Sequence, residues 1–163
     1  MLSKEANIDT RNIHALVIGE HGDSEVSAFS VSTIAGLSIE KFLEDNGKSA
    51  EKVCAEIHEK VKNAAYEIIN KKGATFYAIG LSTAKIIETI LNNQKSVLTV
   101  STFIENEFNG MIQNVYLSLP SVVGRKGVER ILHLNYSYSE VLKLIESSKK
   151  LHETYGTCSN CAN

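Results

Sequence analysis

Apolar residues recur every three or four positions in two long neighbouring segments, and this spacing predicts amphipathic helices. The first segment covers about residues 50–72 and ends with two lysines and Gly73, a composition that suits the C-terminal end of a helix dipole. The second follows at once over about residues 76–91 and ends near Asn92. The pattern therefore predicts two closely joined helices or one broken helix.

Two further helices are indicated by the residues at which they begin. Ser38 is a suitable N-cap for a short helix over "SIEKFLE". Ser137 and Glu140 have the spacing of a capping box, in which each side chain bonds the backbone amide of the other residue. They introduce a final helix whose inward stripe is expected to consist of Val141, Leu144, Ile145, Ser148 and Leu151.

Short runs rich in β-branched residues predict the strands. "HALVI" (14–18) is typical of a strand buried on both faces. "SVLTVSTFI" (96–104) and "IQNVYLSLP" (112–120) are expected to pair antiparallel through a turn at Asn109-Gly110. "SVVGRKGVERIL" predicts another hairpin that turns at residues 124–127. Together these elements indicate one folded unit of the α+β class, an antiparallel sheet packed with long helices.

The composition excludes several classes of partner. Of the 163 residues, 43% are hydrophobic, which is enough for a core, and 17 basic against 19 acidic residues give a net charge of −2. We therefore expect neither a nucleic acid nor an anionic membrane as partner. No apolar run reaches the length of a spanning helix and no signal peptide is recognisable, so we expect a soluble, cytoplasmic chain. Cys158 and Cys161 have the C-x-x-C form of a redox or zinc half-site, but without a second pair a frayed tail is the simpler interpretation, and we expect no metal site.

The polar segment "IGEHGDSE" (18–25) contains the most distinctive chemistry of the chain. An imidazole exchanges a proton near neutral pH, and a nearby carboxylate stabilises its charged form. His21 is therefore either an acid/base residue or a structural loop residue, and pattern alone leaves both open. We expect Asp23 to fix the loop through backbone amides. The remaining histidines are expected to be solvated or structural, since none has a second ligand at metal spacing: His58, His133 and His152.

A resemblance extends this interpretation. "IHALVIGEHGDSE" closely resembles the active-site segment of lactate dehydrogenases in the two-domain lactate/malate dehydrogenase family, and the similarity continues through "KGATFYAIGLSTAKIIETILNN" and "LSLPSVVGRKGVERIL". It implies that residues 1–163 are the C-terminal catalytic and substrate-binding domain. It further implies that His21 is the proton donor and acceptor and that Thr75 lies against the substrate. His14 matches the histidine that meets fructose 1,6-bisphosphate in activated members, although a plain residue at the start of a strand is an equal alternative.

The resemblance also implies what this segment lacks. The family's glycine-rich dinucleotide fingerprint has no counterpart here, so NAD is expected to be bound mainly by an N-terminal domain, and this chain alone is expected to be inactive. The expected activity is NADH-dependent interconversion of pyruvate and L-lactate by a homo-oligomer, with a homotetramer anticipated. Two alternatives stay open: a non-catalytic oligomerisation or scaffold module, and a domain of a malate or other 2-hydroxy acid dehydrogenase.

Overall fold

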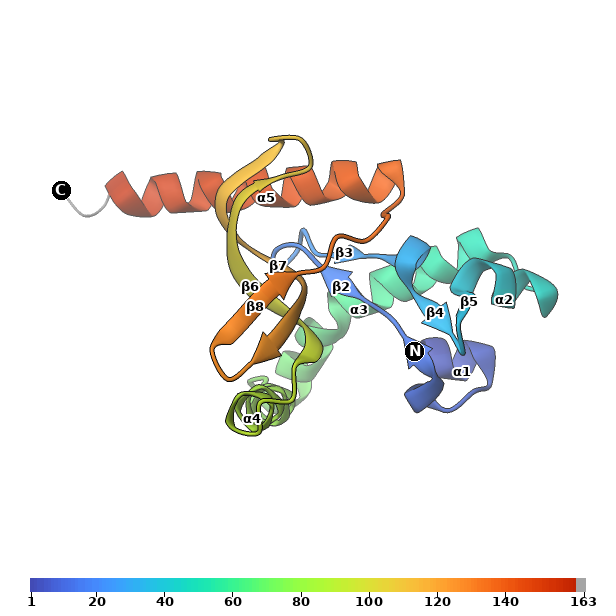
Figure 1. Ribbon diagram of the computed structural model, residues 1–163. Coiled ribbons are helices and arrows are strands. Elements are labelled where there is room, and N and C mark those ends of the chain that lie inside the picture. The colour runs from blue at the N-terminus through green and yellow to red at the C-terminus, as the bar shows by residue number, and fades with distance from the viewer. Residues whose placement is uncertain (161–163) are drawn as a thin grey trace.

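A computed structural model describes residues 1–160, with side chains to residue 156 (Figure 1). The C-x-x-C prediction for Cys158 and Cys161 therefore lies outside the described side chains. Five helices, two 3₁₀ turns and eight strands follow one another within this range. In chain order they are α1 Leu2–Ala6, η1 Thr10–Asn12, β1 Ile13–His14, β2 Val17–Ile18, β3 Val26–Ser27, η2 Phe29–Val31, β4 Thr33–Ile34, β5 Leu37–Ser38, α2 Ile39–Asp45, α3 Ala50–Lys72, α4 Tyr77–Leu91, β6 Ser96–Glu107, β7 Ile112–Gly124, β8 Gly127–Ile131 and α5 Tyr138–Asn160.

The largest sheet has the order β6-β7-β8, and both of its strand pairs are antiparallel. Both predicted hairpins are confirmed: β6 and β7 pair along most of their lengths, and Gly124 pairs with Gly127 across the second turn. Helix α5 crosses one side of this sheet (Figure 1) and packs against β7. The core between them holds Ile18, Val26, Ala28, Ile104, Ile112, Val115, Leu117, Leu119, Leu144 and Ile145. The predicted α+β architecture with an antiparallel sheet is thus confirmed.

A second, smaller core lies beside the first. The sheet β1-β4-β5 and the helices α1, α2 and α3 enclose Leu2, Ile34, Ile39, Leu43, Ala50 and Ile57. Helix α3 begins beside α2 and runs past the strands to end near α4 (Figure 1). The long helix α3 therefore connects the region of the small sheet to that of the large one.

Local signals in the sequence predicted the ends of these helices correctly. Ser38 caps α2 by accepting a hydrogen bond from the Lys41 amide at 3.2 Å. The capping box is formed in both directions: the Glu140 amide donates to Ser137 Oγ at 3.3 Å, and the Ser137 amide donates to Glu140 Oε2 at 3.0 Å. Gly73 ends α3 with a φ of 79°, which separates α3 from α4 and decides for two joined helices rather than a single broken one.

The prediction of one strand over residues 14–18, buried on both faces, is wrong. The segment divides into β1, which pairs with β4, and β2, which pairs with β3. Between them the Leu16 amide donates to Ser32 Oγ and the Leu16 carbonyl accepts from the Ala28 amide, so the chain changes partner there. Val17 is 37% exposed while Ile18 is buried. An apolar run cannot distinguish two short half-exposed strands from one buried strand.

Candidate active site

The loop that carries His21 starts from a tightly fixed base. The Gly19 amide donates to the Ser118 carbonyl at 2.9 Å, and the Ser118 amide donates back to the Gly19 carbonyl at 3.1 Å. The Glu20 amide donates to Ser147 Oγ on α5 at 2.7 Å. Gly19 has a φ of 95°, and a Cβ at this position would come within 2.8 Å of Ser147 Oγ. Strand β7 and helix α5 therefore set the start of the loop, and only glycine fits there.

The loop is then closed on itself by Glu20. Its carboxylate accepts hydrogen bonds from the Ser24 amide, at 3.3 Å, and from the Ser24 hydroxyl. The Glu25 amide donates to the Gly22 carbonyl at 3.1 Å, which completes a turn. Asp23 was expected to have a structural role through the loop amides, but Glu20 accepts from the Ser24 amide in its place. Asp23 instead accepts a hydrogen bond from the Tyr66 hydroxyl on α3 at 2.8 Å.

His21 is at the exposed apex of this loop, at the edge of an open cleft of about 700 Å³. Most of the cleft is apolar, and its walls come from β2, α3, α4 and the large sheet: Val17, Ile18, Val61, Ile79, Ile86, Ile90, Val100, Val123 and Val128. Among the lining side chains, those that titrate are Glu20, His21 and Glu25. The geometry thus presents an imidazole and two carboxylates at the edge of an apolar surface, which is an arrangement suited to proton transfer to a small polar molecule.

Glu25 is the one unexpected participant in this cleft. Its Oε1 atom is buried and has no hydrogen-bond partner among the described residues. Burial raises the pKa of the Glu25 carboxyl, and the charges of His58 and His21 oppose that shift. The sequence offered no signal that distinguished Glu25 from the other acidic residues of the loop.

Helix α3 holds the far side of the same loop. Ser27 Oγ lies 3.0 Å from His58 Nδ1, and Tyr66 reaches Asp23 two helical turns further along. His58 is therefore structural, one of the two alternatives expected for it. Spaced by four residues, His58, Lys62 and Tyr66 share a face of the helix. This spacing was a usable signal that α3 presents polar side chains to another segment.

Two further histidines have neighbouring acceptor atoms. His133 Nδ1 lies 3.2 Å from Glu107 Oε2, and His152 Nε2 lies 2.9 Å from the Gln113 carbonyl. Among the side chains of residues 1–156, no three of the His, Cys, Asp or Glu type are grouped so that they could hold a metal ion. Nor is any helix of that range both long and apolar enough to cross a lipid bilayer.

Neither Thr75 nor His14 lines the cleft beside His21. Thr75 is exposed in the link between α3 and α4 and does not line the cleft. His14 is exposed on β1, opposite Thr33 of β4. The roles that the resemblance implies for these two residues stay predictions.

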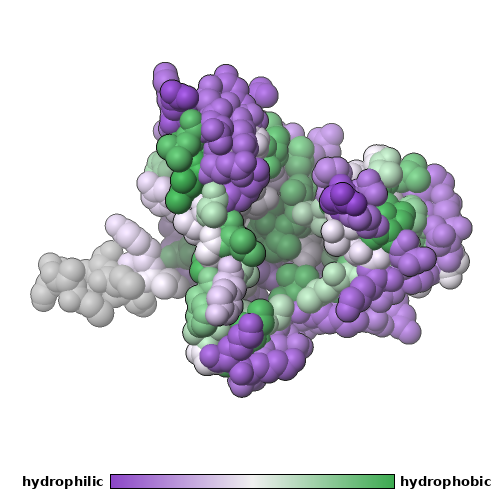
Figure 2. Space-filling model, turned by 90° about the horizontal axis from the view of Figure 1, so that it is seen from below, coloured by the Kyte–Doolittle hydropathy of each residue, from purple (hydrophilic) through white to green (hydrophobic). Residues whose placement is uncertain are grey.

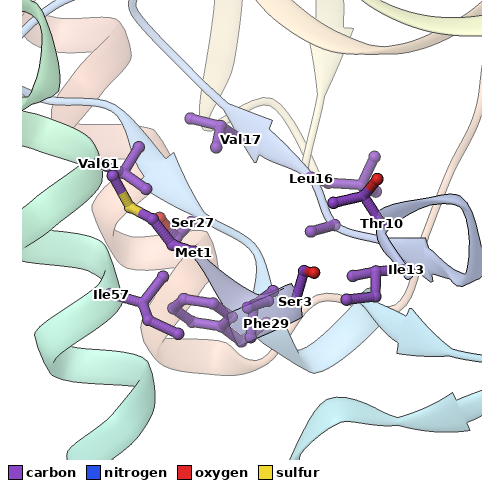
Figure 3. A pocket seen from close by; sticks show the side chains of 12 residues that line it. Met1, Ser3, Thr10, Ile13, Leu16, Val17, Ser27, Phe29, Ile57 and Val61 are labelled. Atoms are coloured by element: carbon purple, nitrogen blue, oxygen red, sulfur yellow. The ribbon is translucent and has the colours of Figure 1, made fainter. Parts of the chain in front are cut away.

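A second cavity, of about 280 Å³, lies near the N-terminus (Figure 3). It is lined by Met1, just before α1, by Phe29 of η2 and by Ile57 and Val61 of α3, and its polar side chains are hydroxyls only. Because no lining side chain is an acid or a base, this cavity has less chemical capacity than the cleft beside His21. The cleft is therefore the candidate active site.

The chain is similar to known proteins over nearly its whole length. The family model for the lactate/malate dehydrogenase, alpha/beta C-terminal domain matches residues 1–160. The L-lactate dehydrogenase of Acetivibrio thermocellus is 41% identical over 158 residues, which are 96% of this chain and 49% of that protein. The L-lactate dehydrogenase of Clostridium botulinum strain 657 is 41% identical over 159 residues, 97% of this chain and 49% of that protein.

Solved structures give the same result. The minor L-lactate dehydrogenase from Enterococcus mundtii in its ligands-bound form superposes with a TM-score of 0.90 at 36% identity, over 96% of this chain and 49% of that one. MGS-M5, a lactate dehydrogenase enzyme from a Medee basin deep-sea metagenome library, gives a TM-score of 0.86 at 35% identity, over 93% of this chain and 48% of that one. The chain spans about half the length of the relatives it matches.

Proposed function

Because the chain belongs to the lactate/malate dehydrogenase family and matches its C-terminal domain, we propose that it is the substrate-binding and catalytic part of an L-lactate dehydrogenase. The observation that carries this proposal is the position of His21 at the apex of a fixed loop, at the edge of the apolar cleft. In this role the chain interconverts pyruvate and L-lactate.

The proposed task of His21 is proton transfer. When pyruvate is reduced, its carbonyl carbon receives a hydride and its carbonyl oxygen receives a proton from the imidazolium of His21. In the reverse direction the neutral imidazole removes the proton from the lactate hydroxyl. Around the imidazole, the cleft offers mostly apolar walls to the bound molecule.

The described residues do not fit a complete dinucleotide. Their sheets are antiparallel throughout, and no glycine-rich strand-turn-helix is present that would cradle a pyrophosphate. We therefore assign the binding of NADH, the proposed source of the hydride in pyruvate reduction, mainly to residues outside this chain. The isolated chain is accordingly expected to show no measurable turnover.

The finer assignments belong to the same proposal. Thr75 is assigned to the substrate and His14 to fructose 1,6-bisphosphate at a contact between subunits of a homotetramer, in a cytoplasmic enzyme. A bisphosphate activates only if it binds the active arrangement more tightly than the inactive one. Loss of activation in His14→Ala, with basal turnover kept, is the expected outcome for that residue.

A second candidate function is a non-catalytic assembly module. It is favoured by one observation: Ile79, Leu81 and Leu91 of α4 are 54%, 75% and 68% exposed, so this helix presents apolar surface that a partner could cover. The two candidates differ in their dependence on His21, because an assembly module does not need an exposed loop imidazole.

The deciding experiment joins this chain to the N-terminal part of the Acetivibrio thermocellus relative and measures NADH oxidation with pyruvate. In this chimera His21→Asn is expected to lower kcat by about 10²–10⁴-fold, the usual contribution of a positioned acid or base. Its free energy of unfolding should change by less than about 0.5 kcal/mol, since the ring is exposed. A chimera that binds NADH without reducing pyruvate, or a His21→Asn variant with normal turnover, would contradict the proposal. Oxaloacetate as an alternative substrate separates lactate from malate specificity.

A further inference from the structure

A hydrogen bond anchors the apex of the His21 loop to α3. The base of the loop is fixed at Gly19 and Glu20 by β7 and α5. Of the hydrogen bonds and ion pairs among the described side chains and backbone, only the one from the Tyr66 hydroxyl to Asp23 Oδ1, at 2.8 Å, ties His21, Gly22 or Asp23 to another helix or strand. All three apex residues are exposed, so packing does little to hold them.

Tyr66, the donor of this hydrogen bond, belongs to α3, a helix that is well placed to support the His21 loop. Further along the loop, Ser27 already contacts His58 on the same face of α3, at 3.0 Å. Tyr66 lies two helical turns after His58 on α3, and the residue that it bonds, Asp23, is two residues beyond His21 in the loop. The hydrogen bond to the Asp23 carboxylate raises the pKa of Tyr66, so the hydroxyl keeps its proton and stays a donor around neutral pH.

We propose that Tyr66 is a positioning residue for His21, whose hydroxyl fixes the apex of the loop against α3 and thereby holds the imidazole at the cleft. The inference deepens the proposed function and rests on it for its catalytic meaning. Tyr66 does not touch the substrate. It acts through Asp23, by narrowing the range of positions that the apex samples.

The structural half of the proposal is tested on this chain by amide hydrogen exchange. In Tyr66→Phe, which removes only the hydroxyl, the amides of Ser24 and Glu25 should exchange several-fold faster, because their turn loses its attachment to α3. The Gly19 amide, which bonds the Ser118 carbonyl, should be unchanged and serves as the internal reference. Tyr138→Phe is the matched control, since Tyr138 is also a helical tyrosine and is 79% exposed. Equal exchange of Ser24 and Glu25 in Tyr66→Phe and wild type would overturn the proposal.

The catalytic half is tested in the chimera described above. Tyr66→Phe should lower kcat by about three- to tenfold with little change in KM, as expected for the loss of one hydrogen bond to a charged group that orders the loop. Asp23→Asn keeps an acceptor and should retain most of the turnover, whereas Asp23→Ala should behave like Tyr66→Phe. The double variant Tyr66→Phe/Asp23→Ala should be no slower than either single variant, because both remove the same contact.

The outcomes separate this inference from the proposed function. If His21→Asn abolishes turnover while Tyr66→Phe and Tyr138→Phe are both normal, the proposed function stands and Tyr66 is not a positioning residue. If His21→Asn leaves turnover intact, the proposed function fails, and faster exchange of Ser24 in Tyr66→Phe then supports only the attachment of the loop.

Discussion

Helices α4 and α5 both pack against β7, and both carry an apolar stripe, yet they use it differently. In α5, Leu144 is fully buried and Ile145 is 8% exposed. In α4, Leu81 and Leu91 are 75% and 68% exposed, and Thr89 is its one buried residue. Figure 2 shows apolar side chains gathered in a hollow between polar lobes on one face of the molecule. Periodicity therefore predicts that a helix has an apolar side, but the partner that covers this side has to come from the three-dimensional structure.

The largest expected difference between the two helices is in the cost of losing a leucine. Leu144→Ala should lower the free energy of unfolding by about 2–5 kcal/mol, because it leaves a cavity between α5 and the large sheet. Leu81→Ala on α4 should change it by less than about 0.5 kcal/mol. Urea unfolding followed by circular dichroism measures both, and equal losses would remove the distinction between the helices.

A second difference lies at the starts of the helices. Helix α5 begins with the two-way capping box of Ser137 and Glu140, whereas Phe76, which precedes α4, provides no side-chain cap. Ser137→Ala should therefore lower the free energy of unfolding by about 1 kcal/mol. Phe76→Ser, which offers a cap to α4, should leave the free energy of unfolding unchanged or raise it. Thermal unfolding of the two variants would contradict this comparison if Ser137→Ala were neutral.

The same box makes α5 sensitive to acid. Burial of Glu140 raises the pKa of its carboxyl, but hydrogen bonds from Ser30 and Ser137 outweigh that effect, and the pKa is lowered below its ordinary value. The stabilisation is therefore complete above the pKa of the unfolded chain, about 4.3, and is lost as the pH falls through the lower folded value. Glu140→Gln should flatten the dependence of stability on pH below about 5. If the slope of the free energy of unfolding against pH were unchanged in Glu140→Gln, the capping box would not be the source of the acid sensitivity.

The smallest effect on folding is expected on the exposed face of α4. Leu81→Glu should leave the free energy of unfolding within about 0.5 kcal/mol of wild type, while it weakens self-association of the chain. Sedimentation velocity over a range of concentrations measures the association. A wild-type chain that stays monomeric at high concentration would show that this apolar face does not by itself recruit a second copy.

Much of the fold was readable from local signals. Ser38, Gly73 and the Ser137–Glu140 pair marked helix ends correctly because a cap acts within one turn of the chain. The two hairpins of the large sheet were equally local, since each turn joins neighbouring strands. The division of residues 14–18 was not readable, because it depends on a hydroxyl of Ser32 that is 16 residues away.

The same difference between local signals and tertiary contacts applies to the candidate site. The position of His21 in a glycine-flanked loop was visible in the sequence, but the function of its neighbours was not. Asp23 was expected to bind adjacent amides, whereas it bonds Tyr66, which is 43 residues away. Glu25 differs from Glu20 only in its surroundings. The Oε1 atom of Glu25 is buried without a partner among the described residues, whereas Glu20 closes the loop onto Ser24. Such roles are set by tertiary contacts, which spacing in one sequence does not encode.

The hydrogen bond between the Glu20 amide and Ser147 also constrains the order in which the molecule can assemble during synthesis. The two residues are 127 positions apart, and a ribosome that adds about 5–20 residues per second needs roughly 6–25 seconds to pass from the first to the second. Throughout this interval the start of the histidine loop lacks the helix that fixes it. The nascent chain therefore fixes the start of this loop only after α5 has left the exit tunnel and docked on the sheet.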